Sequence, residues 1–402
     1  MIMKVSHIIG VSLVTVFLNA CVTVPVPIEP SPAATTGLAT SAIALTPTLE
    51  PHLQPKTSSI STPLSVVNPI SATLSSATSH QLMLKGQRAN WVTLDQEYLY
   101  WTMYQDTRHI FRYPLAGGDT EIVATSRFKD GNLTTFRPIV SGDWMIFLDT
   151  PSSSGNTSWV VRALNLSNQT EQVVIEEAGD PASWPGPWLD VDGDWVVWTR
   201  TGRAKDGACT ESALAVRNLR DGEQLELERA CAEDNLMWVI PHLSENKLVV
   251  ERDLPDSKGG GNDVYFFDLV SGQRTALTND GRSSMPVVSG SWIAWKAGPR
   301  FKPGQYNIVY NKQSGDKQIV PVPQASGDPR LAGEWLYWQP AAQQPLYVYS
   351  LKTKQMLNVV TPRDNESISA VSVYSNTIAW LRDLDFSHAM PHDTVLEWRT
   401  FP

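Results

Sequence analysis

A short motif that recurs about every 46 residues constrains the fold of this chain more than any other feature. Each copy reads as an apolar strand, a tight turn and an aromatic strand, as in Val140-Ser141-Gly142-Asp143-Trp144. Clear copies are centred on Gly142, Gly193, Gly290 and Gly333, and weaker copies on Gln96, Glu245 and Ser375. A repeat of roughly 40 to 50 residues is typical of a β-propeller, in which each repeat forms one four-stranded blade. The sequence therefore predicts an all-β, seven-bladed propeller of four-stranded antiparallel blades.

A second large residue follows the turn aromatic by three positions in six copies. These residues are Trp101, Phe147, Trp198, Trp295, Trp338 and Trp380. Because side chains alternate along a strand, an offset of three places the two large residues on opposite faces. Both faces of a blade must then be buried. A closed ring achieves this, whereas a linear array of sheets would expose Trp-rich faces at its two ends.

The last copy supplies only three strands, within residues 368–373, 378–381 and 395–399. The segment Gln81–Lys85 precedes the first inner strand and has no other partner. We expect this N-terminal strand to complete the seventh blade and close the ring, which removes an exposed sheet edge. Four prolines agree with this layout, because proline lacks a ladder donor and suits the edge strand that faces the channel. They precede the turn residue by four positions: Pro138, Pro241, Pro286 and Pro329.

These repeats resemble the propellers of the TolB type. The segment Ala276-Leu277-Thr278-Asn279-Asp280-Gly281 looks like the end of a repeat in that family. The resemblance covers about residues 80–402 and implies the propeller fold; it implies little about function. The chain has seven copies, whereas TolB has six.

Residues 1–20 read as an export signal, with Lys4 as a basic start and an apolar stretch at Ile8–Leu18. This stretch is too short for a membrane-spanning helix, which needs roughly 20 residues. It runs into Leu18-Asn19-Ala20-Cys21, which resembles the bacterial lipobox. We expect cleavage before Cys21 and acylation of its thiol, with palmitate among the chains. The chain would then be an exported lipoprotein anchored to the cell membrane or, as Val22 favours, the outer membrane. The alternative is an ordinary secretory signal with a chance cysteine.

The chain after Cys21 divides into a tether and a folded domain. Residues 22–79 are rich in Pro, Ser, Thr and Ala and contain no aromatic residue, so residues 21–79 are interpreted as a lipidated cysteine with a disordered tether. All fifteen tryptophans lie between Trp91 and Trp398, which places the propeller at residues 80–402. The formal charge is −9, and no run of Lys or Arg predicts binding to nucleic acid.

Cys209 and Cys231 lie symmetrically about the turn at residues 220–223 of the third repeat. A hairpin through this turn would bring them level, and an exported protein favours a disulfide between them. A metal site is the alternative, but no further ligands lie nearby in the sequence.

The longer loops all fall on one face of the predicted ring, and exposed loops on a rigid scaffold are where function concentrates. Trp184 and Trp188 bracket a stiff Pro-Gly-Pro segment there and form either an aromatic platform for a ligand or a lid on the core. Five polar residues fall at the channel ends of inner strands: Arg137, Asp190, His242, Asp328 and Arg330. Ligand binding and inter-blade salt bridges explain these five equally well.

Metal and cofactor motifs are weak. His388, His392 and Asp393 have helical metal-ligand spacing, but Pro391 lies among them. Asp190, Asp192 and Asp194 resemble a calcium-binding loop, but alignment of the repeats shows that Asp192 belongs to the repeat turn. No catalytic motif or cofactor site is predicted.

Three functions are compatible with this sequence. The favoured one is a membrane-anchored binding or scaffold module that recognises an envelope protein, peptide or glycan through its loop face. The others are a glycan-active enzyme, a lyase or hydrolase with its site at the channel mouth, and a purely structural envelope component. The sequence makes no prediction of oligomeric state.

Overall fold

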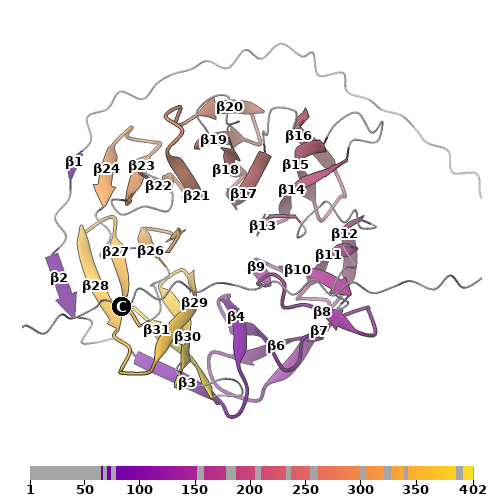
Figure 1. Cartoon of the computed structure of the whole chain (residues 1–402), viewed down its shortest axis with the longest axis vertical. Coiled ribbons are helices and arrows are strands. Elements are labelled where there is room, and N and C mark those ends of the chain that lie inside the picture. Colours follow the sequence, from indigo (N-terminus) through magenta and orange to yellow (C-terminus); the bar gives the residue numbers. More distant parts are fainter. Residues whose placement is uncertain are drawn as a thin grey trace, which may run out of the picture. The chain divides into compact units, whose positions relative to one another are not determined.

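The computed structural model describes residues 65–66, 70–73, 78–151, 158–177, 187–203, 210–231, 237–253, 261–298, 305–320, 327–338, 343–385 and 393–401. Its strands form seven antiparallel blades around a central axis (Figure 1). The prediction of a seven-bladed all-β propeller is confirmed. The innermost strands of neighbouring blades contact one another around the channel.

Blades 1 to 4 contain the following strands, from the channel outward. Blade 1 has β4 (Ala89–Leu94), β5 (Tyr98–Met103), β6 (His109–Pro114) and β7 (Glu121–Thr125); blade 2 has β8 (Gly131–Asn132) and β9 (Ile139–Ser141), then β10 (Trp144–Pro151), β11 (Trp159–Asn165) and β12 (Glu171–Glu177); blade 3 has β13 (Leu189–Asp192), β14 (Trp195–Arg203), β15 (Thr210–Asn218) and β16 (Gln224–Cys231); blade 4 has β17 (Met237–Ser244), β18 (Lys247–Asp253), β19 (Asn262–Asp268) and β20 (Gln273–Ala276).

Blades 5 to 7 continue the ring in the same order. Blade 5 has β21 (Ser283–Ser289), β22 (Trp292–Ala297), β23 (Tyr306–Asn311) and β24 (Lys317–Val320); blade 6 has β25 (Pro329–Ala332), β26 (Trp335–Trp338), β27 (Leu346–Ser350) and β28 (Gln355–Val360); blade 7 has β29 (Ser367–Tyr374), β30 (Thr377–Asp383), β31 (Thr394–Thr400) and β3 (Thr78–Leu84). In blade 7, β3 pairs antiparallel with β31 from Thr78–Thr400 to Leu84–Thr394. The fourth strand of the last blade therefore comes from the N-terminal side of the ring.

Two further strands lie outside the ring, in the segment predicted to be a disordered tether. The strand β1 (Ser65–Val66) pairs in parallel with β24, and β2 (Ile70–Thr73) pairs in parallel with β28 (Figure 1). The interpretation of this segment as coil does not hold for these six residues. The reason is that the outer edges of blades 5 and 6 present unpaired backbone groups, which can bind an extended segment whatever its side chains.

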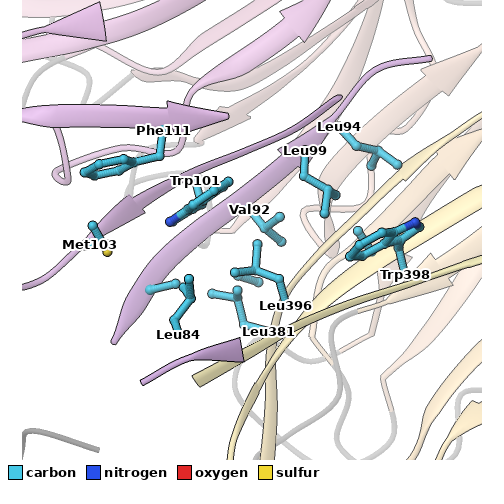
Figure 2. Close-up of a cluster of buried hydrophobic side chains, with 13 residues drawn as sticks. Leu84, Val92, Leu94, Leu99, Trp101, Met103, Phe111, Leu381, Leu396 and Trp398 are labelled. Atoms are coloured by element: carbon cyan, nitrogen blue, oxygen red, sulfur yellow. The ribbon is translucent and has the colours of Figure 1, made fainter. Parts of the chain in front are cut away.

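A separate hydrophobic cluster fills each of the seven junctions between blades. Figure 2 shows the cluster between blades 7 and 1, where Trp101 packs with Leu84, Leu381 and Leu396. The six large residues predicted to bury the second face of each blade are all at most 2% exposed. Apolar packing at every junction therefore holds the ring together, since burying such side chains is the dominant favourable term in folding.

In blades 2 to 7 the first turn places its first residue in the left-handed region, with φ between 49° and 56° at Gly142, Gly193, Glu245, Gly290, Gly333 and Ser375. A two-residue hairpin turn requires this conformation, and glycine adopts it without strain. We call the side of the ring that carries these turns the turn face, and the opposite side the loop face.

At the turn face, four junctions carry what we call a rim hydrogen bond. In each, the backbone N–H of the first turn residue donates to the side chain that precedes the turn in the previous blade. The pairs are Gly193 to Ser141 Oγ (3.1 Å), Glu245 to Asp192 Oδ2 (2.6 Å), Gly290 to Ser244 Oγ (3.3 Å) and Gly333 to Ser289 Oγ (2.9 Å). These four junctions join blades 2 to 6 in series.

Candidate ligand-binding site

The residue five positions before the first turn residue marks the loop-face end of each inner strand. The seven residues at this position form the mouth of the channel: Trp91, Arg137, Trp188, Ile240, Met285, Asp328 and Ala370. Three of them adopt a positive φ, namely Ile240 (52°), Met285 (53°) and Ala370 (47°). At these places the inner strand bulges against its neighbour, and in two of them the next residue is one of the predicted edge prolines.

A cavity of about 50 Å³ opens at this mouth. Its lining comes from blades 1, 2, 6 and 7: Trp91, Val92, Arg137, Asp328, Arg330, Ala370 and Val371. Three of the five predicted channel residues, Arg137, Asp328 and Arg330, therefore share one cavity although almost 200 residues separate Arg137 from Arg330.

The two arginines of the cavity are unpaired. Neither Arg137 nor Arg330 forms an ion pair or a side-chain hydrogen bond with any residue that the structure describes. The charge of Arg330 and burial together lower the pKa of Arg137 to about 10. Two partly buried like charges that form no ion pair are a cost in the empty protein, and an anion between them would reduce it.

The chain around Arg137 is built to hold it at the mouth. The inner edge of blade 2 is divided into β8 and β9, which both pair with β10, and Arg137 lies in the segment between them. The Thr134 carbonyl of this segment accepts hydrogen bonds from Trp91 Nε1 and Asn90 Nδ2, each at 2.9 Å. Trp91 thus both lines the cavity and fixes the segment that carries Arg137.

The other two predicted channel residues serve the ring itself. Asp190 Oδ2 accepts a hydrogen bond from the Leu243 backbone N–H at 2.7 Å, and His242 Nδ1 lies 3.4 Å from the Val288 backbone N–H. Burial is the main cause that lowers the pKa of His242, which favours the neutral ring that accepts this bond. Asp190 and His242 also face each other at 3.6 Å. Asp190 and His242 thus form hydrogen bonds between blades rather than a salt bridge, and among the described residues Arg137 and Arg330 form no inter-blade ion pair.

The tryptophan platform is described only in part. Trp184 lies outside the described residues. Trp188 is 41% exposed and packs edge-to-face on Phe136, with ring centroids 6.0 Å apart. Trp188 therefore packs on a residue of the cluster between blades 2 and 3 and keeps an exposed side at the mouth, beside the residue that precedes Arg137.

The metal alternatives gain no support from the described residues, in which no group of three metal-ligating side chains occurs. His388 and His392 lie outside them, and Asp393 Oδ1 accepts the Gly86 backbone N–H at 2.7 Å. The carboxylates of Asp190, Asp192 and Asp194 each bind different protein groups.

Of the three cysteines, Cys21 and Cys209 lie outside the described residues. In the third blade Cys231 stands opposite Glu211, two positions from Cys209. The register at the turn, where Arg217 pairs with Gln224, accounts for one position, and a bulge between Leu214 and Ala215 accounts for the other. The expectation that a regular hairpin sets the two cysteines level was wrong in this respect. The disulfide itself stays a prediction.

Trp91 and the split inner edge of blade 2 were not predicted. Trp91 has a signal in the sequence, since it stands five positions before Gln96 just as Arg137 stands before Gly142.

In the described part of the chain, no helix has the length and apolar character to span a membrane.

No protein-family model matches the sequence, and no curated protein sequence matches it. Solved structures do match in fold. An oligogalacturonate lyase in complex with manganese is 10% identical, with a TM-score of 0.56 over 84% of this chain and 99% of that one. The β-propeller domain of the Trilobed protease from Pyrococcus furiosus is 11% identical, with a TM-score of 0.54 over 74% of this chain and 92% of that one.

An acylaminoacyl peptidase from Pyrococcus horikoshii is also 11% identical, with a TM-score of 0.53 over 74% of this chain. This chain covers 49% of that peptidase. At such identities the likeness shows the β-propeller fold alone.

Proposed function

We propose that this protein is a binding module whose ligand enters the propeller at the loop-face mouth. The observation that carries the proposal is the pair of unpaired guanidiniums, Arg137 and Arg330, on one cavity. Structural arginines in this ring do have partners, as Arg162 does with Asp149 at 2.8 Å. Arginines that form no ion pair or side-chain hydrogen bond with a described residue are better explained by a partner that arrives from outside.

The setting that we propose is the bacterial envelope. Cleavage before Cys21 and acylation of its thiol, with palmitate among the chains, would anchor the protein to the cell membrane or outer membrane, with the propeller outside the cytoplasm. The ligand would be an envelope protein, peptide or glycan. Kinship with the TolB-type propellers, which rests on the repeat motif and the segment Ala276–Gly281, belongs to the same proposal.

A thermal-shift assay on the full-length protein tests the binding function. Envelope material is separated into protein, peptidoglycan, polysaccharide and lipid fractions, and each fraction is added in turn. One fraction should raise the Tm of the wild type and fail to raise that of R137Q and R330Q. The control is R220Q, because Arg220 lies at the turn face and is 76% exposed. A fraction that stabilises all variants equally would place the ligand elsewhere and contradict the proposal.

The second candidate is a glycan-active enzyme, a lyase or hydrolase, because an oligogalacturonate lyase shares the fold over 99% of its length. Incubation with a panel of polysaccharides, with and without a chelator, would reveal new reducing ends or unsaturated products. A purely structural envelope component is the third, and it predicts no response of Tm to any fraction.

A further inference from the structure

The charges around the mouth cavity select among ligands, and this step rests on the proposed function. The lining carries the guanidiniums of Arg137 and Arg330 and the carboxylate of Asp328. The formal charge of these three lining side chains is therefore +1; Asp190 lies outside the lining, accepts the Leu243 backbone N–H, and by its charge raises the pKa of Arg137. A single negative charge would balance the lining.

We infer that the mouth recognises a sugar acid, with the carboxylate of the sugar between Arg137 and Arg330 and a neighbouring hydroxyl donating to Asp328. Guanidinium groups match the planar geometry of a carboxylate and bind it through paired hydrogen bonds. A carboxylate of the protein can only accept hydrogen bonds, so Asp328 requires a donor on the ligand. A hydroxyl supplies that donor and adds no charge.

Other small ligands fit these charges less well. A phosphate dianion would exceed the charge of the lining and bring its oxygens against Asp328. An amino acid zwitterion could place its ammonium group on Asp328, but its zero net charge would leave the lining at +1. A simple carboxylate such as acetate would leave Asp328 without a donor, and an unmatched polar group at a binding site lowers affinity.

The size of the cavity decides how such a ligand would sit. A volume of about 50 Å³ holds a carboxylate group and at most a water molecule beside it, and not a whole sugar ring. The ring of the sugar would remain outside the cavity, at the loop face, while Trp91 and Val92 supply the apolar part of the cavity wall. A saccharide that continues beyond the first unit would extend toward Trp188, which is 41% exposed at the same mouth.

The test is a titration of the full-length protein in detergent with five probes: D-glucuronate, D-glucose, acetate, inorganic phosphate and glycine. D-Glucose is the neutral counterpart of D-glucuronate, so the pair isolates the carboxylate. We expect D-glucuronate to bind at least tenfold more tightly than any other probe. Both R137Q and R330Q should weaken D-glucuronate at least tenfold, and R220Q should leave it unchanged. The variant D328N should weaken D-glucuronate relative to acetate, because loss of the Asp328 charge favours any anion equally, while the sugar hydroxyl loses a charged acceptor.

Each contrary result has a distinct meaning. Equal binding of D-glucose, or tighter binding of phosphate, acetate or glycine, overturns the sugar acid. If no probe binds while an envelope fraction still needs Arg137 and Arg330, the sugar acid is wrong and the binding function stands. If neither the probes nor the fractions respond to the two arginines, both proposals fail.

Discussion

The junctions between blades fall into two groups that differ at the turn face. Four consecutive junctions, between blades 2 and 6, carry a rim hydrogen bond; the junctions 6–7, 7–1 and 1–2, which we call the open junctions, carry none among the residues that the structure describes. The position that accepts the bond explains the difference. It is Ala332 in blade 6, which has no acceptor, and Tyr374 in blade 7, whose side chain is 37% exposed. In blade 1 it is Asp95, which accepts from its own turn at Glu97 and Tyr98.

Both groups have a hydrophobic cluster at every junction, so closure of the ring does not depend on the rim hydrogen bonds. The open junctions are also those whose inner strands line the mouth cavity, which blades 6, 7, 1 and 2 surround. The cavity thus lies in the arc whose junctions have no rim hydrogen bond among the described residues. Apolar packing holds the ring together, and polar contacts distinguish one arc of it from the other.

The largest effect should come from the core and should be the same in both groups. We expect W101A, at the open junction 7–1, and W295A, at the junction 4–5, each to lower the free energy of unfolding by about 3 to 5 kcal/mol. Both tryptophans are 1% exposed and occupy the same position in the repeat. Urea denaturation measures both. A loss several kcal/mol larger for W101A would mean that rim hydrogen bonds support the core where they are present.

Removal of a rim acceptor should cost less. Asp192 accepts from the Glu245 backbone N–H at 2.6 Å and from Ser141 Oγ at 3.0 Å, so it contributes to two junctions. We expect D192A to lower the free energy of unfolding by about 1.5 to 2 kcal/mol, as is typical for hydrogen bonds to a charged group. The comparison variant is S289A, which loses one neutral rim bond and should cost about 1 kcal/mol. Equal costs would contradict the double role of Asp192.

Acid should weaken the arc with rim hydrogen bonds through His242, which lies in blade 4. Burial lowers the pKa of His242 below its ordinary value of 6.5. Below pH 6.5 the unfolded chain binds a proton that the folded protein does not, so stability falls as the pH falls toward the folded pKa. The slope from one histidine is at most about 1.4 kcal/mol per pH unit.

Denaturation of the wild type and of H242N at pH 7.5 and pH 5.5 measures this contribution. Asparagine keeps an acceptor near the position of Nδ1 and cannot titrate in this range. The loss between the two pH values should therefore be smaller in H242N by up to about 1 kcal/mol. An identical loss in both proteins would assign the acid sensitivity to other groups.

At the mouth, R137Q should stabilise the empty protein while it abolishes ligand binding. Arg330 and burial lower the pKa of Arg137 to about 10, so its charge destabilises the folded state at every pH below that value. We expect a gain on the order of 1 kcal/mol at pH 7, measured by denaturation without ligand. A loss of stability would show that Arg137 has a structural role.

The smallest effect should be the gain of a missing rim bond. Serine at position 332 would place a hydroxyl where Ser141, Ser244 and Ser289 stand, beside the Ser375 turn with its φ of 52°. We expect A332S to raise the free energy of unfolding by about 0.5 kcal/mol. No gain would mean that blades 6 and 7 meet at a different geometry from the other four pairs.

The sequence predicted the ring because the information repeats. Seven aligned turns, six of them followed by a large buried residue on the second face of the strand, indicate one closed arrangement. The same alignment placed Arg137, Asp328 and Arg330 at the channel, because the number of residues between each of them and the turn fixes its position along the inner strand. The alignment could not distinguish these three residues from Asp190 and His242, because side-chain rotamers decide which channel residues form hydrogen bonds with a neighbouring blade. The rim bonds were missed because serine before glycine was interpreted only as part of a turn.

What the sequence did not predict depends on backbone contacts or on local irregularities. Nothing in the side chains of Ser65–Val66 and Ile70–Thr73 marks them as strands; the edges of blades 5 and 6 bind their backbone. The bulge between Leu214 and Ala215 shifts a ladder by one residue with no glycine or proline to indicate it.

The pairing of β3 with β31 also has a consequence for the order of events during synthesis. The strand β3 is synthesised before its partner β31, because Thr394 follows its partner residue Leu84 by about 310 residues. At 5 to 20 residues per second, this separation corresponds to roughly 15 to 60 seconds. During that time blades 1 to 6 can form as they are synthesised, but blade 7 cannot be completed until β31 is available. The nascent ring is an open arc with β3 unpaired at one end, and only the last strand to emerge closes it.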